Sequence, residues 1–168
     1  AHAQRVELAN GDVYEGELVD GLRNGKGTYV WVDGNRYEGD FENDRLHGEG
    51  TYTWTDGRTY VGDFVRDRRE GQGTLQWLNG DRYVGQFVNN QMHGKGVFTW
   101  ANQDTYEGDF VAGQRTGKGT FKWESGAEYS GDFVAGVMQG QGHYSFPDDR
   151  QFIGNFEDGK KVGQGVFL

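Results

Sequence analysis

Cysteine is absent from this 168-residue chain, and proline occurs once, at Pro147. Without cysteine the chain can form neither a disulfide framework nor a thiolate-ligated metal site. The absence fits the cytoplasm and is compatible with an exported protein as well. Apolar runs are short too, since mean hydropathy is −0.86. No stretch approaches the roughly 20 apolar residues of a membrane-spanning helix.

Basic side chains are in the minority, with 17 Lys and Arg against 26 Asp and Glu. The formal net charge is therefore −9, and a chain of this sign repels polyanions at long range. Nucleic acid is not expected as a partner, and bulk charge also disfavours anionic membrane surfaces.

Glycine is plentiful, at 30 residues, and glycine-rich polar chains are often disordered. Disordered chains are poor in aromatic residues, however, and here these make up 15% of the chain. All 25 aromatic residues fall into four columns with a step of 23 residues. The first column begins each repeat and reads Tyr14, Tyr37, Tyr60, Tyr83, Tyr106, Tyr129 and Phe152. Another column reads Trp31, Trp54, Trp77, Trp100, Trp123 and Phe146. Such a fixed period indicates a repeat protein.

Each repeat alternates with a period of two, as in Tyr37-Glu38-Gly39-Asp40-Phe41 and Gly50-Thr51-Tyr52-Thr53-Trp54. This alternation predicts two short strands with one apolar face, around 37–41 and 50–54, joined by a loop near 43–48. We expect an all-β fold: a single elongated, curved, solenoid-like antiparallel meander of about seven 23-residue β-hairpin repeats. Residues 1–13 are interpreted as a degenerate N-terminal strand or cap, and 14–168 as the array.

The turn between repeats carries Asp-Gly or a related pair, as at Asp56-Gly57. If successive repeats keep their aromatic residues on one face, the loop must hold an odd number of residues. Thr55-Asp56-Gly57 fits a bulged three-residue hairpin with Gly in the left-handed region. Gln103 and Asp149 replace this Gly, so those turns are expected to be strained or differently shaped. A second loop column, also expected to have positive φ, reads Gly21, Asp44, Asp67, Asn90, Gly113, Gly136 and Gly159.

The pattern Tyr-x-Gly-x-Phe, then Gly-x-Gly-x-(Tyr/Phe)-x-Trp and Asp-Gly, resembles the MORN (membrane occupation and recognition nexus) repeat. Residues 37–57 are a near-consensus copy, and the resemblance covers residues 9–168. It implies a curved meander of hairpins that acts as a scaffold, with membrane or cytoskeletal association in similar arrays. It implies binding to protein segments and, as proposed for the family, to phospholipid. The repeat carries no catalytic residue.

Motifs of known chemistry match this sequence only weakly. Gly21–Lys26 approaches a phosphate-binding loop, but Gly27 stands where a hydroxyl is needed. His47 and His93 lie two repeats apart, about 19 Å at the usual strand spacing, which is too far for one metal ion. The acidic pairs, such as Glu38 and Asp40, are interpreted as a repeated solvated face. We therefore predict no catalytic residues, no metal and no cofactor.

Two candidate binding surfaces remain. The first is an aromatic concave face that a single sheet cannot hide completely, and exposed aromatic surface commonly marks a binding site. Its predicted groove residues are Tyr37, Trp54, Tyr60, Trp77, Tyr83, Trp100, Tyr106 and Trp123. The expected occupant is a helical or extended segment of a partner protein, or a second copy of the chain forming a homodimer.

The second candidate surface consists of basic loops, which would serve a phospholipid-binding module. Arg66, Arg68 and Arg69 form one basic cluster in the third repeat, and Lys160 and Lys161 lie in the equivalent loop of the seventh.

Overall fold

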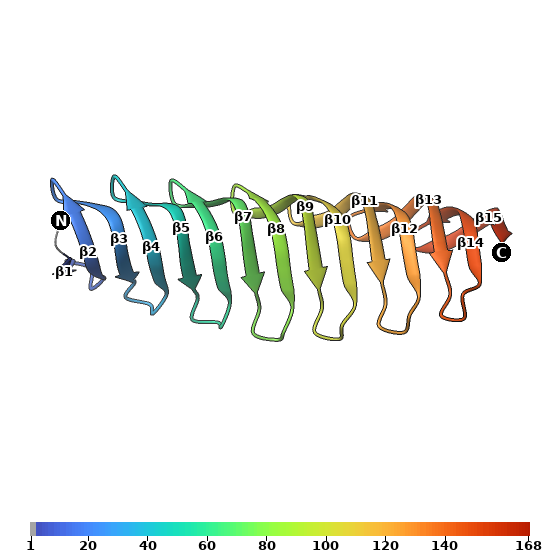
Figure 1. The fold of residues 1–168 in the computed structure, drawn as a ribbon, viewed down its shortest axis with the longest axis horizontal. Helices are drawn as coiled ribbons and strands as arrows, with labels where there is room; N and C mark the ends of the chain where they lie inside the picture. The colour runs from blue at the N-terminus through green and yellow to red at the C-terminus, as the bar shows by residue number, and fades with distance from the viewer. Residues whose placement is uncertain (1–2) are drawn as a thin grey trace. The chain divides into compact units, whose positions relative to one another are not determined.

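The computed structural model describes residues 3–168, which form fifteen antiparallel strands that follow one another in chain order in one open sheet (Figure 1). No helix occurs among these residues. The predicted all-β meander is therefore confirmed. Ala1 and His2, the first two residues of the predicted cap, lie outside the described residues.

The strands from β2 onward come in pairs, a seven-residue strand followed by a nine-residue strand, with eight residues in the last. The strands are β1 (Gln4–Glu7), β2 (Val13–Val19), β3 (Leu22–Val30), β4 (Arg36–Glu42), β5 (Arg45–Thr53), β6 (Thr59–Val65), β7 (Arg68–Gln76), β8 (Arg82–Val88), β9 (Gln91–Thr99), β10 (Thr105–Val111), β11 (Gln114–Lys122), β12 (Glu128–Val134), β13 (Val137–Ser145), β14 (Gln151–Glu157) and β15 (Lys160–Phe167).

The chain divides into two compact units, one of residues up to 79 with 87–90, the other of residues 80–86 with 91–168. In the first unit, Tyr52 of β5 lies opposite both Tyr37 of β4 and Tyr60 of β6. In the second, Phe121 of β11 lies opposite both Tyr106 of β10 and Tyr129 of β12. Opposed residues share a face, so in each unit the aromatic columns lie on one side of the sheet.

The prediction of a loop near 43–48 is wrong, because the connection between the two strands is much shorter. Only Asn43 and Asp44 connect β4 to β5, with φ of 48° and 72°, and residues 45–48 already belong to β5. Two central residues with positive φ are the mark of a type I′ turn, whose twist matches that of the flanking strands. The predicted positive φ at the second turn residue is confirmed in all seven hairpins.

A register slip explains why the sequence looked loop-like there, and it occurs in the β2–β3, β4–β5, β6–β7, β10–β11, β12–β13 and β14–β15 hairpins. Gly39 lies opposite Gly50, but Phe41 lies opposite Leu46, so one residue, Asp40, faces three. The Asp40 carboxylate accepts the Glu49 N–H at 3.0 Å in place of a strand partner. The prediction of a solvated acidic face is therefore wrong for the column of Asp40, because its side chains accept hydrogen bonds from the backbone of the bulge.

The bulge folds each strand toward its aromatic side. Residues four apart on an extended strand are separated by about 13 Å, yet the ring centroids of Tyr37 and Phe41 lie 5.1 Å apart, edge to face. The Tyr60 and Phe64 rings repeat this contact at 5.1 Å. The part of the hairpin beyond the bulge, the folded arm, lies over the aromatic side. It supplies the second layer that a flat sheet would lack. The core consists of the rings enclosed in this fold.

The three-residue turns between repeats are confirmed. Trp54 N–H donates to the Arg58 carbonyl at 3.0 Å, and Gly57 N–H donates to the Trp54 carbonyl at 3.1 Å. Gly57 has a φ of 94°. Gln103 and Asp149 keep the same two hydrogen bonds, at φ of 78° and 71°. Those two turns therefore have the same shape as the turns with Gly. They differ in backbone strain, because the left-handed conformation is strained for any residue with a Cβ.

Candidate functional site: the mouth of the aromatic fold

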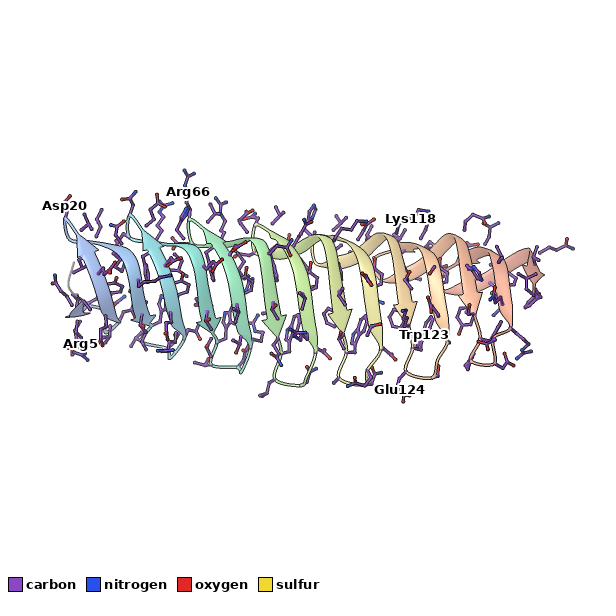
Figure 2. All side chains as sticks on the ribbon, in the orientation of Figure 1. Arg5, Asp20, Arg66, Lys118, Trp123 and Glu124 are labelled. Carbon is purple, nitrogen blue, oxygen red and sulfur yellow. The ribbon has the colours of Figure 1, made fainter. Side chains whose placement is uncertain are left out.

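Tryptophan rings lie at the open edge of the aromatic fold, next to the three-residue turns. In the first unit, Trp54 packs on Tyr52 at 4.5 Å and Tyr52 packs on Trp31 at 5.1 Å, with the rings tilted. In the second, Trp123 and Trp100 flank Phe121 at 4.5 and 5.1 Å. Figure 2 shows Trp123 beside the turn that carries Glu124. All five tryptophans are half-buried, so part of each ring is open to a ligand. We call each unit's row its tryptophan ladder.

The tyrosines of the predicted groove lie deeper than expected. Tyr37, Tyr60, Tyr83 and Tyr106 are each 0% exposed, and burial raises the pKa of Tyr106 to about 12. The Tyr37 hydroxyl donates to the Asp40 carbonyl at 2.7 Å, behind the folded arm. This corrects the predicted groove at these four positions, because the four tyrosines are buried beneath the surface and the tryptophans are the part of the predicted groove that is accessible.

Cations lie across the rings in alternate repeats. The Arg69 guanidinium lies 5.1 Å from the Trp54 ring centroid, and that of Arg115 lies 5.0 Å from Trp100. Guanidinium groups over aromatic faces gain cation–π attraction. The column of these residues alternates cationic and apolar side chains: Arg23, Leu46, Arg69, Met92, Arg115, Met138 and Lys161. Sequence reasoning missed this column, although the same 23-residue step would have found it.

The predicted basic cluster is split by strand alternation. Arg66 lies in the β6–β7 turn, where Figure 2 places it at the tip of a hairpin, and Arg68 is exposed. Arg69 turns to the aromatic side and is half-buried. Lys160 and Lys161 are both exposed, and the Lys161 ammonium lies 5.1 Å from the Phe146 ring centroid. With two of its five cations committed to the rings, the basic surface gives the phospholipid alternative no support.

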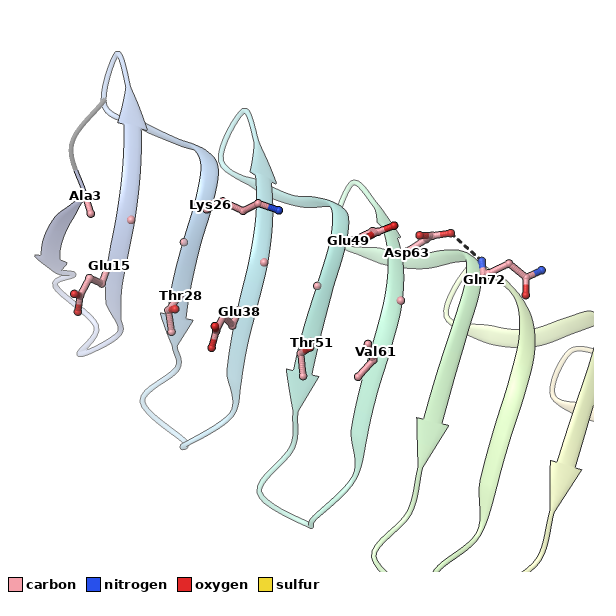
Figure 3. Close-up of a pocket in the computed structure, with 15 residues that line it drawn as sticks. Ala3, Glu15, Lys26, Thr28, Glu38, Glu49, Thr51, Val61, Asp63 and Gln72 are labelled. Atoms are coloured by element: carbon pink, nitrogen blue, oxygen red, sulfur yellow. Dashed lines mark hydrogen bonds between the residues drawn. The ribbon is translucent and has the colours of Figure 1, made fainter.

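A hollow of about 920 Å³ lies on the polar face of the first unit (Figure 3). Its floor is glycine backbone, as at Gly39 and Gly50, and its rim carries charged residues such as Glu38. Among the described residues, no Trp, Tyr or Arg lines it, and these are the residue types that dominate binding energy. Three hollows on the aromatic side are smaller, about 240 Å³ beside Trp100, 340 Å³ beside Trp31 and 430 Å³ beside Trp123. We favour the aromatic side, because its hollows combine aromatic walls with a cation.

Comparison with known proteins identifies the repeat. The family model described as the MORN repeat matches seven segments, residues 14–36, 37–57, 60–82, 83–105, 106–128, 129–149 and 152–168. No curated protein matches the sequence. No helix that could cross a membrane occurs in residues 3–168, and within that range no three His, Asp or Glu side chains are grouped as a metal site would require.

Solved structures share the fold at low sequence identity. The TCP domain of Drosophila melanogaster SAS-4, solved with a proline-rich motif of Ana2, has a TM-score of 0.53 at 14% identity, covering 92% of this chain and 90% of that one. The TCP10c domain of D. melanogaster Sas-4 has a TM-score of 0.50 at 11% identity, covering 93% of this chain and 100% of that one. At such identity the likeness concerns the fold alone.

Proposed function

Because this chain belongs to the MORN repeat family, we propose that it is a non-enzymatic interaction scaffold that binds an extended segment of a partner protein along a tryptophan ladder. The observation that carries this proposal is the ladder itself: half-buried indole rings at the mouth of a rigid aromatic fold. Trp is among the residues most enriched at binding hot spots. Rings fixed by neighbours lose little conformational entropy on binding.

The extended form of the ligand is supported by the half-buried tryptophans, which recur every 23 residues along each unit. Aromatic-lined grooves suit polyproline and other extended segments, which have little conformational freedom to lose. The SAS-4 domain, which shares the fold, is described in complex with a proline-rich motif. A second copy of this chain on the ladder would appear as a dimer in the test below, whereas a helical segment or a lipid surface as the ligand would leave no extended peptide selected.

Selection from a displayed library of extended peptides, including proline-rich ones, on the full chain tests the proposal. Selected peptides should lose about tenfold or more in affinity when Trp100→Ala and Trp123→Ala are combined, because hot-spot truncations cost on the order of 2 kcal/mol. The matched control is Glu107→Gln, an exposed residue of β10 on the opposite face. Equal binding by the two variants would move the binding surface off the ladder, and light scattering on the same samples would reveal a dimer instead.

A further inference from the structure

Three arginines occupy the same position in alternate repeats, and the residue facing each differs. Arg23 meets Asp44, whose Oδ1 accepts its Nε at 2.7 Å while the Asp44 carbonyl accepts Nη2 at 2.8 Å. The carboxylate thus fills the site beside the guanidinium and neutralises it. This pair shows which ligand the position takes when the chain itself supplies one.

In the next such repeat, an amide replaces the carboxylate. The Asn90 carbonyl accepts Nη2 of Arg69 at 2.8 Å, but its Oδ1 is used by the Arg69 backbone N–H at 2.9 Å. The Arg69 Nε is buried without a hydrogen-bond partner among residues 3–168. No carboxylate among residues 3–168 pairs with this cation, and its buried Nε is closed to a ligand from outside.

The third of these arginines, Arg115, faces no side chain at this place, because Gly136 stands where Asp44 stands for Arg23. A methyl carbon built on Gly136 would lie 2.9 Å from Nη2 of Arg115, so the vacant position lies directly beside the guanidinium. Within residues 3–168 no carboxylate pairs with Arg115. Burial lowers the pKa of Arg115, as expected for a cation removed from water without a counterion.

The surroundings of Arg115 suit a ligand. It lines the hollow of about 240 Å³ together with Trp100, Met92 and Gly136, and no acidic residue lines this hollow. The corresponding hollow at Arg23 contains both Asp44 and Asp67. The Arg23 site contains its own carboxylate. The Arg115 site has the same cation and the same kind of aromatic wall, but the place of the carboxylate is empty.

We infer that Arg115 is a carboxylate-recognition subsite, which takes an Asp or Glu side chain of the extended protein segment that lies on the tryptophan ladder. The inference deepens the proposed function and rests on it for the identity of the partner. An incoming carboxylate would occupy the place that Asp44 fills beside Arg23, with its flanking residue against Trp100. A charge-assisted bond to a partly desolvated guanidinium is stronger than its neutral counterpart.

Arginine side-chain NMR of the full chain tests this with a defined probe, the peptide Ac-Leu-Glu-Leu-NH2 and its isosteric control Ac-Leu-Gln-Leu-NH2. The Glu peptide should shift the Arg115 Nε–Hε resonance saturably, with an affinity about tenfold or more above that of the Gln peptide. Equal affinity for the two peptides, or no response of Arg115, would overturn the inference.

Swaps taken from the chain's own repeats provide matched variants. Arg115→Met introduces the residue found in the same column at 92 and 138, and Gly136→Asp recreates the internal carboxylate of Asp44; both should remove the preference for the Glu peptide over the Gln peptide. Asp44→Gly should make the Arg23 resonance responsive, a gain that unfolding cannot imitate. Unchanged peptide binding by Arg115→Met and Gly136→Asp would refute the subsite.

The two proposals fail separately. If library peptides require the tryptophans but bind Arg115→Met as tightly as the original chain, the subsite is refuted and the scaffold function is supported. If Arg115 responds to the Glu peptide but no library peptide is sensitive to the tryptophan substitutions, the subsite is supported and binding along the ladder is refuted.

Discussion

A single glycine can decide whether a tyrosine fits the core. Tyr37 lies flat against β5 at Gly50, and a methyl carbon built on Gly50 would lie 2.3 Å from the tyrosine oxygen and 2.4 Å from Cε1. The ring is fully buried and its hydroxyl is bonded to Asp40, so it cannot move aside at low cost. Aromatic coverage of strand glycines is thus a packing requirement here.

Gly50→Ala should therefore destabilise the chain by about 3 kcal/mol, the upper part of the range for overpacking a core. The control is Gly21→Ala, where no atom lies within 4 Å of the new methyl carbon but φ is +79°. It should cost about 1 kcal/mol, through backbone strain alone. Urea denaturation of both variants measures the difference, and equal midpoints would contradict the packing argument.

At the scale of the hairpin, two different turns serve two different purposes. The two-residue turn, such as Asn43-Asp44, closes each hairpin, and its Asp44 N–H reaches back to the Arg23 carbonyl of the preceding repeat at 2.9 Å. The three-residue turn joins repeats, and Asn35 Oδ1 accepts the Thr55 N–H of the next such turn at 3.0 Å. Neighbouring turns are therefore bonded to one another within a unit, which stiffens the edge that carries the tryptophans.

Strain in one of these turns can be removed. Gln103 holds a φ of 78° where other turns have Gly, so Gln103→Gly should stabilise the chain by about 1 kcal/mol, the cost of a left-handed residue with a Cβ. The gain is reduced by the greater flexibility of Gly in the unfolded chain. Thermal denaturation should show a higher melting temperature, and Gly57→Gln should give the opposite shift. A lower melting temperature for Gln103→Gly would show that the turn is unstrained.

At the scale of the whole molecule, the sequence predicted the period, the strands and the shared aromatic face. These follow from the spacing of Tyr and Trp and from the alternation within each repeat. It did not predict the fold of each strand, because the slip at Asp40 depends on a carboxylate that replaces a backbone partner, which periodicity does not reveal. The burial of Tyr37 and the contact of Arg69 with Trp54 both depend on that fold.

Acid should destabilise the molecule. The pKa is lowered at six aspartates: Asp12, Asp40, Asp44, Asp56, Asp109 and Asp148. For Asp109, the hydrogen bond from Lys95 and the Lys118 N–H stabilise the ionised form. A folded-state pKa below the unfolded value of about 3.9 means that the stabilisation is complete above that value and is lost as pH falls through the folded pKa.

The midpoint of urea denaturation should therefore be constant between pH 7 and 5 and fall below about pH 4. Asp109→Asn should flatten this fall slightly, by less than about 1 kcal/mol, because the Lys95 pair is exposed to solvent. The amide keeps an acceptor for the bulge, as Gln86 does naturally at 3.1 Å from the Lys95 N–H. A midpoint that rises on acidification would contradict the assignment.

The alternation of cationic and apolar residues over the rings bears on how such a chain can lengthen. Arg23, Arg69 and Arg115 are separated by two steps of 23 residues, with Leu46 and Met92 between them. Copying or excising a single repeat would place two arginines, or two apolar residues, in consecutive repeats. Only gain or loss in twos preserves the order. The segment that can be duplicated without altering the surface is therefore 46 residues long, twice the folding motif, and a designer who extends the array should add repeats in pairs.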